Sequence, residues 1–214
     1  MDTQINDTLA DALSDIQLLS HPFYQRWEAG QLSRDELASY AEQYRYFETM
    51  LPTFLESLSE QLPEGTARDA VLDNLRDEIA PPSHLELFEL FATHYGAANV
   101  DASPAMVQLL EAYRDVLSCG PESALAGLWA YESQGAAIAS SKAEGLRTHY
   151  AVDSAGVAFW DAHWLVEGDH ATWTLHAITS LEPDVNDVAD AARRVGEAWW
   201  SFLDERELVV ASAQ

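Results

Sequence analysis

Two histidines and a glutamate share one face of a predicted helix in the last third of the chain. His163, Glu167 and His170 are spaced i, i+4 and i+7. At ~100° and about 1.5 Å per residue, their side chains fall within roughly 60° of one another over ~10 Å. Glu167 and His170 also form the Glu-x-x-His step with which one helix of a di-iron bundle binds its metals. The stripe therefore predicts a metal centre, provided that other helices supply more carboxylates.

Two further segments offer such ligands. Glu132 lies between apolar turns of a predicted helix, where an unpaired carboxylate is costly to bury and a metal or another cation is a plausible partner. Glu78 precedes and His84 follows Pro81-Pro82, a proline pair that turns the chain so that both side chains can face one cavity. Simpler interpretations remain open. Glu132 can lie at the edge of a polar face. Asp73, Asp77 and Glu78 can form an ordinary acidic face with His84 as a surface residue, and Glu86 competes for the carboxylate role.

Helical periodicity dominates the elements that must position these residues. Ser33 to Glu36 reads as a capping box, and apolar residues then recur at i, i+3, i+4 and i+7 for about 25 residues. The candidate ligands fall on predicted helices at about 66–79, 83–94, 121–146 and 154–179, and an earlier helix is predicted at about 5–19. No strand alternation or linker is evident. We expect one all-α domain over residues 1–214, a bundle of seven or eight helices.

The composition excludes several classes of protein. The chain has 214 residues with 36 acidic and 11 basic side chains, a net charge of −25. Nucleic acid and anionic membranes are therefore poor partners, and the scattered acids suggest a surface of the halophile type. Cys119 is the single cysteine, which excludes an internal disulfide and multi-cysteine metal sites. Without a basic, apolar leader or a long apolar segment, a cytoplasmic protein is expected.

One base is unusual. Ten of the eleven are arginines, and Lys142 is the only lysine, although lysine is normally among the commonest residues. Either Lys142 has a specific role, or it is one leftover surface lysine. On an ideal helix it lies ~15 Å along and ~80° around from Glu132, so it reaches the metals only if the helix bends or the cavity is long.

Several motifs resemble those of known proteins. His21-Pro22-Phe23-Tyr24-Gln25-Arg26-Trp27, with Gly30 and Leu37-Ala38-Ser39-Tyr40-Ala41, resembles the opening of heme-oxygenase-like proteins. That superfamily includes thiaminase-type and pyrroloquinoline-quinone-synthesis (PqqC-like) proteins. Leu72 to Glu78, Ser83-His84, Tyr131-Glu132-Ser133-Gln134 and the stripe at 163–170 together resemble heme-oxygenase-like di-metal oxidases. Among these, the chain is most similar to the oxygen-dependent 4-aminobenzoate synthases of folate biosynthesis that are related to the chlamydial death-domain-associating protein (CADD).

The resemblance, which covers roughly residues 10–205, implies a heme-oxygenase-like bundle that holds two metal ions, Fe/Fe or Fe/Mn. It implies metal ligands at Glu78, His84, Glu132, His163, Glu167 and His170. It also implies that the ring of Tyr24 becomes the aminobenzoate and that Lys142 supplies the amine. Tyr40 and Tyr131 match tyrosines near the site that could relay electrons. The chain departs from the pattern in having Glu167 where aspartate is usual, and one residue fewer between Glu78 and His84.

Our leading hypothesis is therefore a di-metal oxidase that uses O₂ and an external reductant to make 4-aminobenzoate from Tyr24. A second hypothesis is an oxidase of the same fold that acts catalytically on an exogenous small molecule. A third is a metal-free binding or interaction protein. A thiaminase-like hydrolase is disfavoured because Cys119 lies in a helix-terminus loop, and heme degradation because few basic residues remain to bind propionates. The sequence is compatible with a homodimer, and we expect neither nucleic acid nor membrane as a partner.

Overall fold

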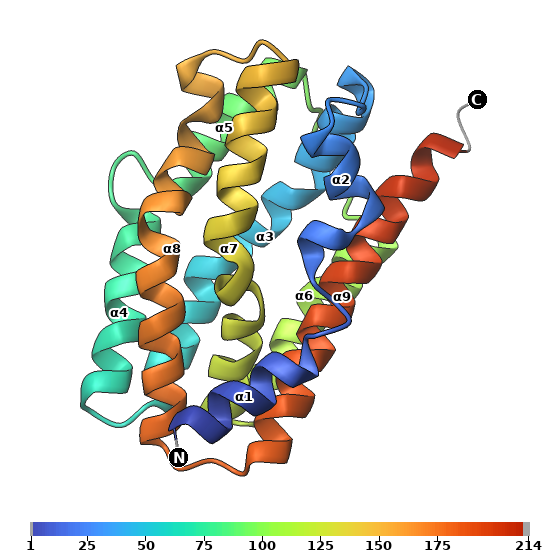
Figure 1. Ribbon diagram of the computed structural model, residues 1–214. Helices are drawn as coiled ribbons and strands as arrows, with labels where there is room; N and C mark the ends of the chain where they lie inside the picture. Colours follow the sequence, from blue (N-terminus) through green and yellow to red (C-terminus); the bar gives the residue numbers. More distant parts are fainter. Residues whose placement is uncertain (1, 212–214) are drawn as a thin grey trace.

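Helices account for nearly all of the chain (Figure 1). The computed structural model describes the backbone of residues 2–211 and the side chains of residues 3–164 and 170–208. This part contains no strand, so the all-α prediction is confirmed, with nine α-helices where seven or eight were expected. In chain order the α-helices are α1 (Asp2–Ala12), α2 (Pro22–Glu28), α3 (Arg34–Gln61), α4 (Thr66–Ile79), α5 (His84–Tyr95), α6 (Pro104–Cys119), α7 (Pro121–His149), α8 (Ser154–Ser180) and α9 (Val185–Ala211). A short 3-10 helix, η1 (Leu18–Ser20), lies between α1 and α2.

The helix predicted at 5–19 is wrong in its second half, because the α-helix ends at Ala12 and only a 3-10 turn follows at Leu18–Ser20. The side-chain amide of Gln17 donates to the carbonyl of Leu13 at 2.9 Å. The backbone N–H of Leu18 donates to Oε1 of Gln134 on α7 at 2.7 Å. These side chains satisfy backbone groups that a continuous helix would pair internally, so the chain can turn before α2.

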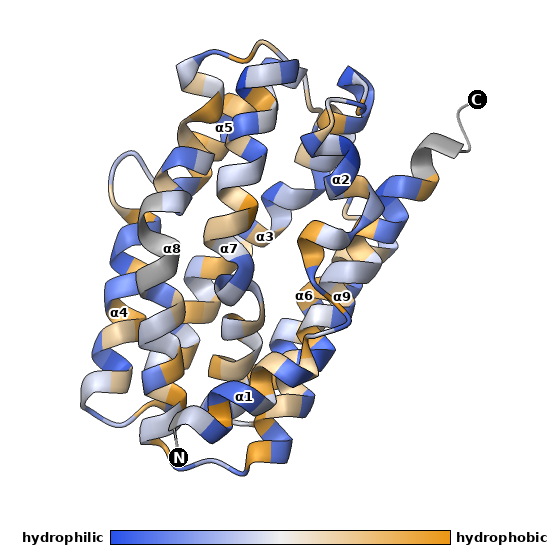
Figure 2. Cartoon of the chain, in the orientation of Figure 1, coloured by the Kyte–Doolittle hydropathy of each residue, from blue (hydrophilic) through white to orange (hydrophobic). Residues whose placement is uncertain are grey.

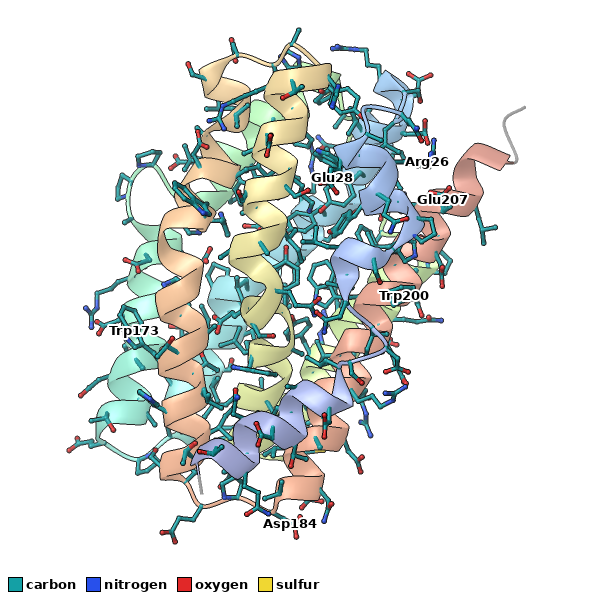
Figure 3. The ribbon with its side chains drawn as sticks, viewed as in Figure 1. Arg26, Glu28, Trp173, Asp184, Trp200 and Glu207 are labelled. Atoms are coloured by element: carbon teal, nitrogen blue, oxygen red, sulfur yellow. The ribbon has the colours of Figure 1, made fainter. Side chains whose placement is uncertain are left out.

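The long helix α7 is the centre of the bundle. It packs along α8 and α9 and also contacts α2, α3 and α6, while α4 and α5 pack against α8 and against α3 (Figure 1). The ion pair between Arg26 on α2 and Glu207 on α9, 3.0 Å long, ties the end of α9 to the short second helix (Figure 3). The helices that carry the candidate ligands thus surround one interior.

Hydrophilic and hydrophobic residues alternate along the helices, and many outward-facing turns are hydrophilic (Figure 2). Across the described residues, no helix combines the length and apolarity that a bilayer span requires.

The apolar stripe of α3 forms as predicted. Its start is a capping box: Ser33 accepts from the N–H of Glu36, and the Glu36 carboxylate accepts from the N–H of Ser33. The stripe buries Tyr40, Tyr44 and further apolar residues against the core. Glu48 is buried on this same stripe, an exception to its apolar character.

Candidate metal centre

Four helices carry the candidate ligands. Glu78 lies in the last turn of α4, and His84 is the first residue of α5, so the intervening turn brings the two side chains together. Ser83 caps α5 and forms a capping box with Glu86. Because the exposed Glu86 accepts the N–H of Ser83 at 2.8 Å, its carboxylate serves the cap. The alternative in which Glu86 replaces Glu78 in the cavity is therefore wrong.

Glu78, His84 and His163 converge from α4, α5 and α8. One ligand atom of each lies within 4.8 Å of the others, and all three side chains are buried. Nδ1 of His84 is 3.0 Å from Oε2 of Glu78, yet the pair does not form a hydrogen bond. The rings of His84 and His163 lie 4.3 Å apart between centroids. Two ligand atoms that approach without bonding to each other suit a shared cation, and the interpretation of His84 as a surface residue is wrong.

The environment of His163 favours the form that binds metal. Its Nδ1 lies 3.0 Å from the carbonyl oxygen of Phe159, so the ring donates from Nδ1 and Nε2 carries the lone pair. Burial, and then the neighbouring His84, hold the pKa of His163 well below its ordinary value. A neutral imidazole whose other nitrogen is fixed by a backbone carbonyl is the usual state of a metal-binding histidine.

Glu132 and His170 line one small cavity together with Glu78, His163 and Glu48. Glu132 is only 6% exposed, which rules out the edge of a polar face. Its carboxylate accepts hydrogen bonds of 2.6 Å from Nδ2 of Asn74 and from the hydroxyl of Thr174. Burial raises the pKa of Glu132 despite these donors and the nearby His170. Since both donors are neutral, its charge is left to be balanced by a cation.

His170 has a carboxylate partner that the sequence interpretation left in an ordinary acidic face. Nε2 of His170 lies 3.2 Å from Oδ2 of Asp77, which is about half exposed on α4. Such an outer carboxylate orients a metal-binding imidazole and sets its tautomer. The predicted ligand Glu167 lies within the backbone of α8, but its side chain is outside the described residues.

Lys142 belongs to a second buried cluster rather than to the metal cavity. Its Nζ donates to the hydroxyl of Tyr24 at 2.9 Å and to that of Tyr40 at 2.6 Å. Lys142 is 1% exposed, so the interpretation as a leftover surface lysine is wrong. Burial, in spite of the distant Glu48 carboxylate, holds its pKa well below the ordinary value. Burial therefore favours the neutral, nucleophilic form of this amine, which lies against the phenol of Tyr24.

A line of tyrosines joins the two clusters. The ring of Tyr40 stacks on that of Tyr44, with centroids 5.2 Å apart. The hydroxyl of Tyr44 lies 2.8 Å from that of Tyr131, which lines the metal cavity beside Glu132. The sequence interpretation included Tyr40 and Tyr131 but treated Tyr44 only as a core residue. Lys142 does not line the metal cavity, and Tyr44 lies between the two clusters.

The donor set fits a pair of divalent cations. Carboxylates and imidazoles converge without thiolate, a combination that suits iron or manganese. Several buried polar atoms in this region have no hydrogen-bond partner of good geometry among the described residues: Nδ1 of His84, Oδ1 of Asn74 and both carboxylate oxygens of Glu48. Buried polar atoms of this kind are normally paired, so they point to a missing partner such as a cation.

Three comparisons place the chain among known proteins. A protein named 4-aminobenzoate synthase from Nitrosomonas europaea is 34% identical over 207 residues, which is 87% of this chain and 84% of that protein. One of the same name from Chlamydia pneumoniae is 29% identical over 209 residues, 92% of each chain. A solved domain from Shewanella denitrificans, described as having a heme oxygenase-like fold, superposes with a TM-score of 0.77 at 14% identity and covers 98% of this chain and 93% of that one.

The solved domain shows the fold alone, and it confirms the expected heme-oxygenase-like architecture. The model of a family described as iron-containing redox enzymes matches residues 38–200, a span that holds the converging ligands and Lys142. The chain therefore belongs to this family of iron-containing redox enzymes.

Proposed function

We propose that this protein is an O₂-dependent di-metal oxidase that makes 4-aminobenzoate from its own Tyr24, with Lys142 as the source of the amine. The observation that carries the proposal is the 2.9 Å contact between Nζ of Lys142 and the hydroxyl of Tyr24. It joins the residue to be consumed to the only amine side chain in the sequence. The relatives named 4-aminobenzoate synthase support the same product.

Glu78, His84, Glu132, His163 and His170 would hold the two ions, together with Glu167, whose side chain lies outside the described residues. When bound, iron or an iron–manganese pair would supply O₂ activation, with electrons from an external reductant. The protein residues orient these ligands: Asn74 and Thr174 fix Glu132, and Asp77 fixes His170.

The second cluster would handle the proton and the electron of the phenol. Burial raises the pKa of Tyr24, so the ring keeps its proton until it is oxidised. Nζ of Lys142 lies 2.9 Å from the hydroxyl of Tyr24, close enough for the two groups to exchange a proton. Tyr40, Tyr44 and Tyr131 provide the route for the electron toward the metals. Close packing of Trp27 and Trp160 around Lys142 excludes water from this cluster.

The size of the metal cavity favours an internal substrate over an exogenous one. The cavity lined by described residues has a volume of about 10 Å³, close to the least that holds one water molecule. An aromatic ring does not fit there without rearrangement, whereas Tyr24 is already in place in the adjoining cluster.

Tyr24→Phe tests the proposal directly. Iron-loaded variant protein, given O₂ and a reductant, should yield at least 100-fold less 4-aminobenzoate than wild type by mass spectrometry, because the phenol to be oxidised is gone. Tyr46→Phe is the matched control, since the hydroxyl of Tyr46 donates to the carbonyl of Val100, away from both clusters, and wild-type yield is expected. Wild-type yield from Tyr24→Phe would refute the internal substrate and select catalysis on an exogenous molecule.

A further inference from the structure

Glu48 is a buried carboxylate of the metal cavity that the proposed ligand set does not include. It projects from α3 at 2% exposure and lines the cavity with Glu78, Glu132, His163 and His170. Among the described residues, neither of its carboxylate oxygens accepts a hydrogen bond of good geometry. The hydroxyl of Tyr44 lies nearby but pairs with that of Tyr131 at 2.8 Å, and both buried oxygens of Glu48 lack a hydrogen bond of good geometry.

A carboxylate in that position needs either a proton or a cation. The amine of Lys142 is committed to the hydroxyls of Tyr24 and Tyr40, so it does not form an ion pair with Glu48. The cavity already holds the carboxylates of Glu78 and Glu132. A divalent cation is the partner that satisfies a third carboxylate there.

We propose that Glu48 is a further metal ligand, which binds one of the two ions of the di-metal centre from α3. The helix is well placed for this, because α3 packs against α4, α5 and α7, which carry Glu78, His84 and Glu132. Carboxylate oxygen is also a ligand that iron and manganese prefer. The inference rests on the proposed di-metal function and adds a ligand from a helix that otherwise supplies none.

The test is a titration of metal-free, full-length protein with Mn²⁺, followed by electron paramagnetic resonance and by metal analysis of the bound fraction. Wild type should bind two ions per chain. Glu48→Gln should bind one of them about tenfold more weakly or lose it, because the amide is a poorer ligand than the carboxylate. Glu56→Gln removes the same charge from the exposed side of α3 and should bind as wild type does. Wild-type affinity at both sites of Glu48→Gln would overturn the proposal.

Melting curves separate a ligand from a merely protonated buried acid. If Glu48 binds metal, the rise in melting temperature on adding Mn²⁺ should be smaller for Glu48→Gln than for Glu56→Gln. A Glu48→Gln protein that is more stable without metal, yet shows the wild-type rise with metal, would contradict the proposal. Wild type that binds no Mn²⁺ or Fe²⁺ would instead refute the di-metal function itself, whereas unaltered metal binding by Glu48→Gln would leave that function intact.

Discussion

The metal cavity and the Tyr24–Tyr40–Lys142 cluster are both buried, but they differ in how their ionisable side chains are stabilised away from water. In the cavity, carboxylates such as Glu132 keep only neutral hydrogen-bond donors, so a cation is still required. In the cluster, Lys142 is surrounded by phenol groups and aromatic rings, and burial lowers the pKa of its amine, which favours the neutral form. We therefore expect metal to complete the first region, whereas burial shifts the second toward the neutral amine. Perturbing either should leave the other largely unchanged.

The largest expected effect comes from removing the amine. Lys142→Met keeps the length and apolar stem of the side chain, but it can neither supply nitrogen nor accept the proton of Tyr24. Formation of 4-aminobenzoate should fall at least 100-fold, while the protein still binds two metal ions with wild-type affinity. Mass spectrometry of the product and metal analysis of the same sample check both parts. Loss of metal together with product would show that the two regions are not separable.

Removal of metal should have the next largest effect, and it should act on the cavity alone. At ligand concentrations 100 times Kd, linkage gives about 2.7 kcal/mol of stabilisation for each bound ion, or roughly 5–10 °C in Tm per ion for a chain of this size. Chelation should abolish that rise in wild type and in Lys142→Met alike.

A pair of histidine variants on α8 provides the control for the metal effect. His163→Ala should lose the metal-induced rise, whereas His176→Ala, at an exposed position of the same helix, should retain it. Equal rises in the two variants, measured by calorimetry, would contradict a metal site at His163.

The smallest effect is a dependence of stability on pH that belongs to the amine cluster. Because the pKa of Lys142 is depressed in the folded protein, the unfolded chain binds more protons at this residue than the native state. The stability of wild type relative to Lys142→Met should therefore rise with pH, by at most about 1.4 kcal/mol per pH unit. The rise should span the window from the depressed pKa to the ordinary lysine value near 10.5. Urea unfolding at several pH values measures it, and a fall with rising pH would mean that Lys142 is charged in the native state.

Much of this architecture follows from local patterns. The capping box at Ser33 and the apolar stripe after it predict α3, and the proline pair after Glu78 predicts the break between α4 and α5. The single lysine was a sound indication of a special position, since Lys142 proved to be buried. Each of these signals is carried by residues close together in the chain or by the composition as a whole.

What escaped prediction depends on distant contacts. The segment between α1 and α2 is held by Gln134, which is 116 residues from the Leu18 whose N–H it accepts. The contact of Asp77 with His170 joins residues 93 positions apart. Glu48 gave a weaker signal, because one carboxylate beside an apolar stripe usually lies at its solvated border. Asn74 could have been assigned to the site from the sequence, since it lies four residues before Glu78 and so on the same face of α4.

The most direct test of the account follows the ring atoms of tyrosine. Protein grown with ring-¹³C-tyrosine would be loaded with iron and exposed to O₂ and reductant in unlabelled buffer. The account predicts labelled 4-aminobenzoate, at most one molecule per chain, with a matching loss of the intact peptide that contains Tyr24. Unlabelled product, or many molecules per chain with Tyr24 intact, would contradict it.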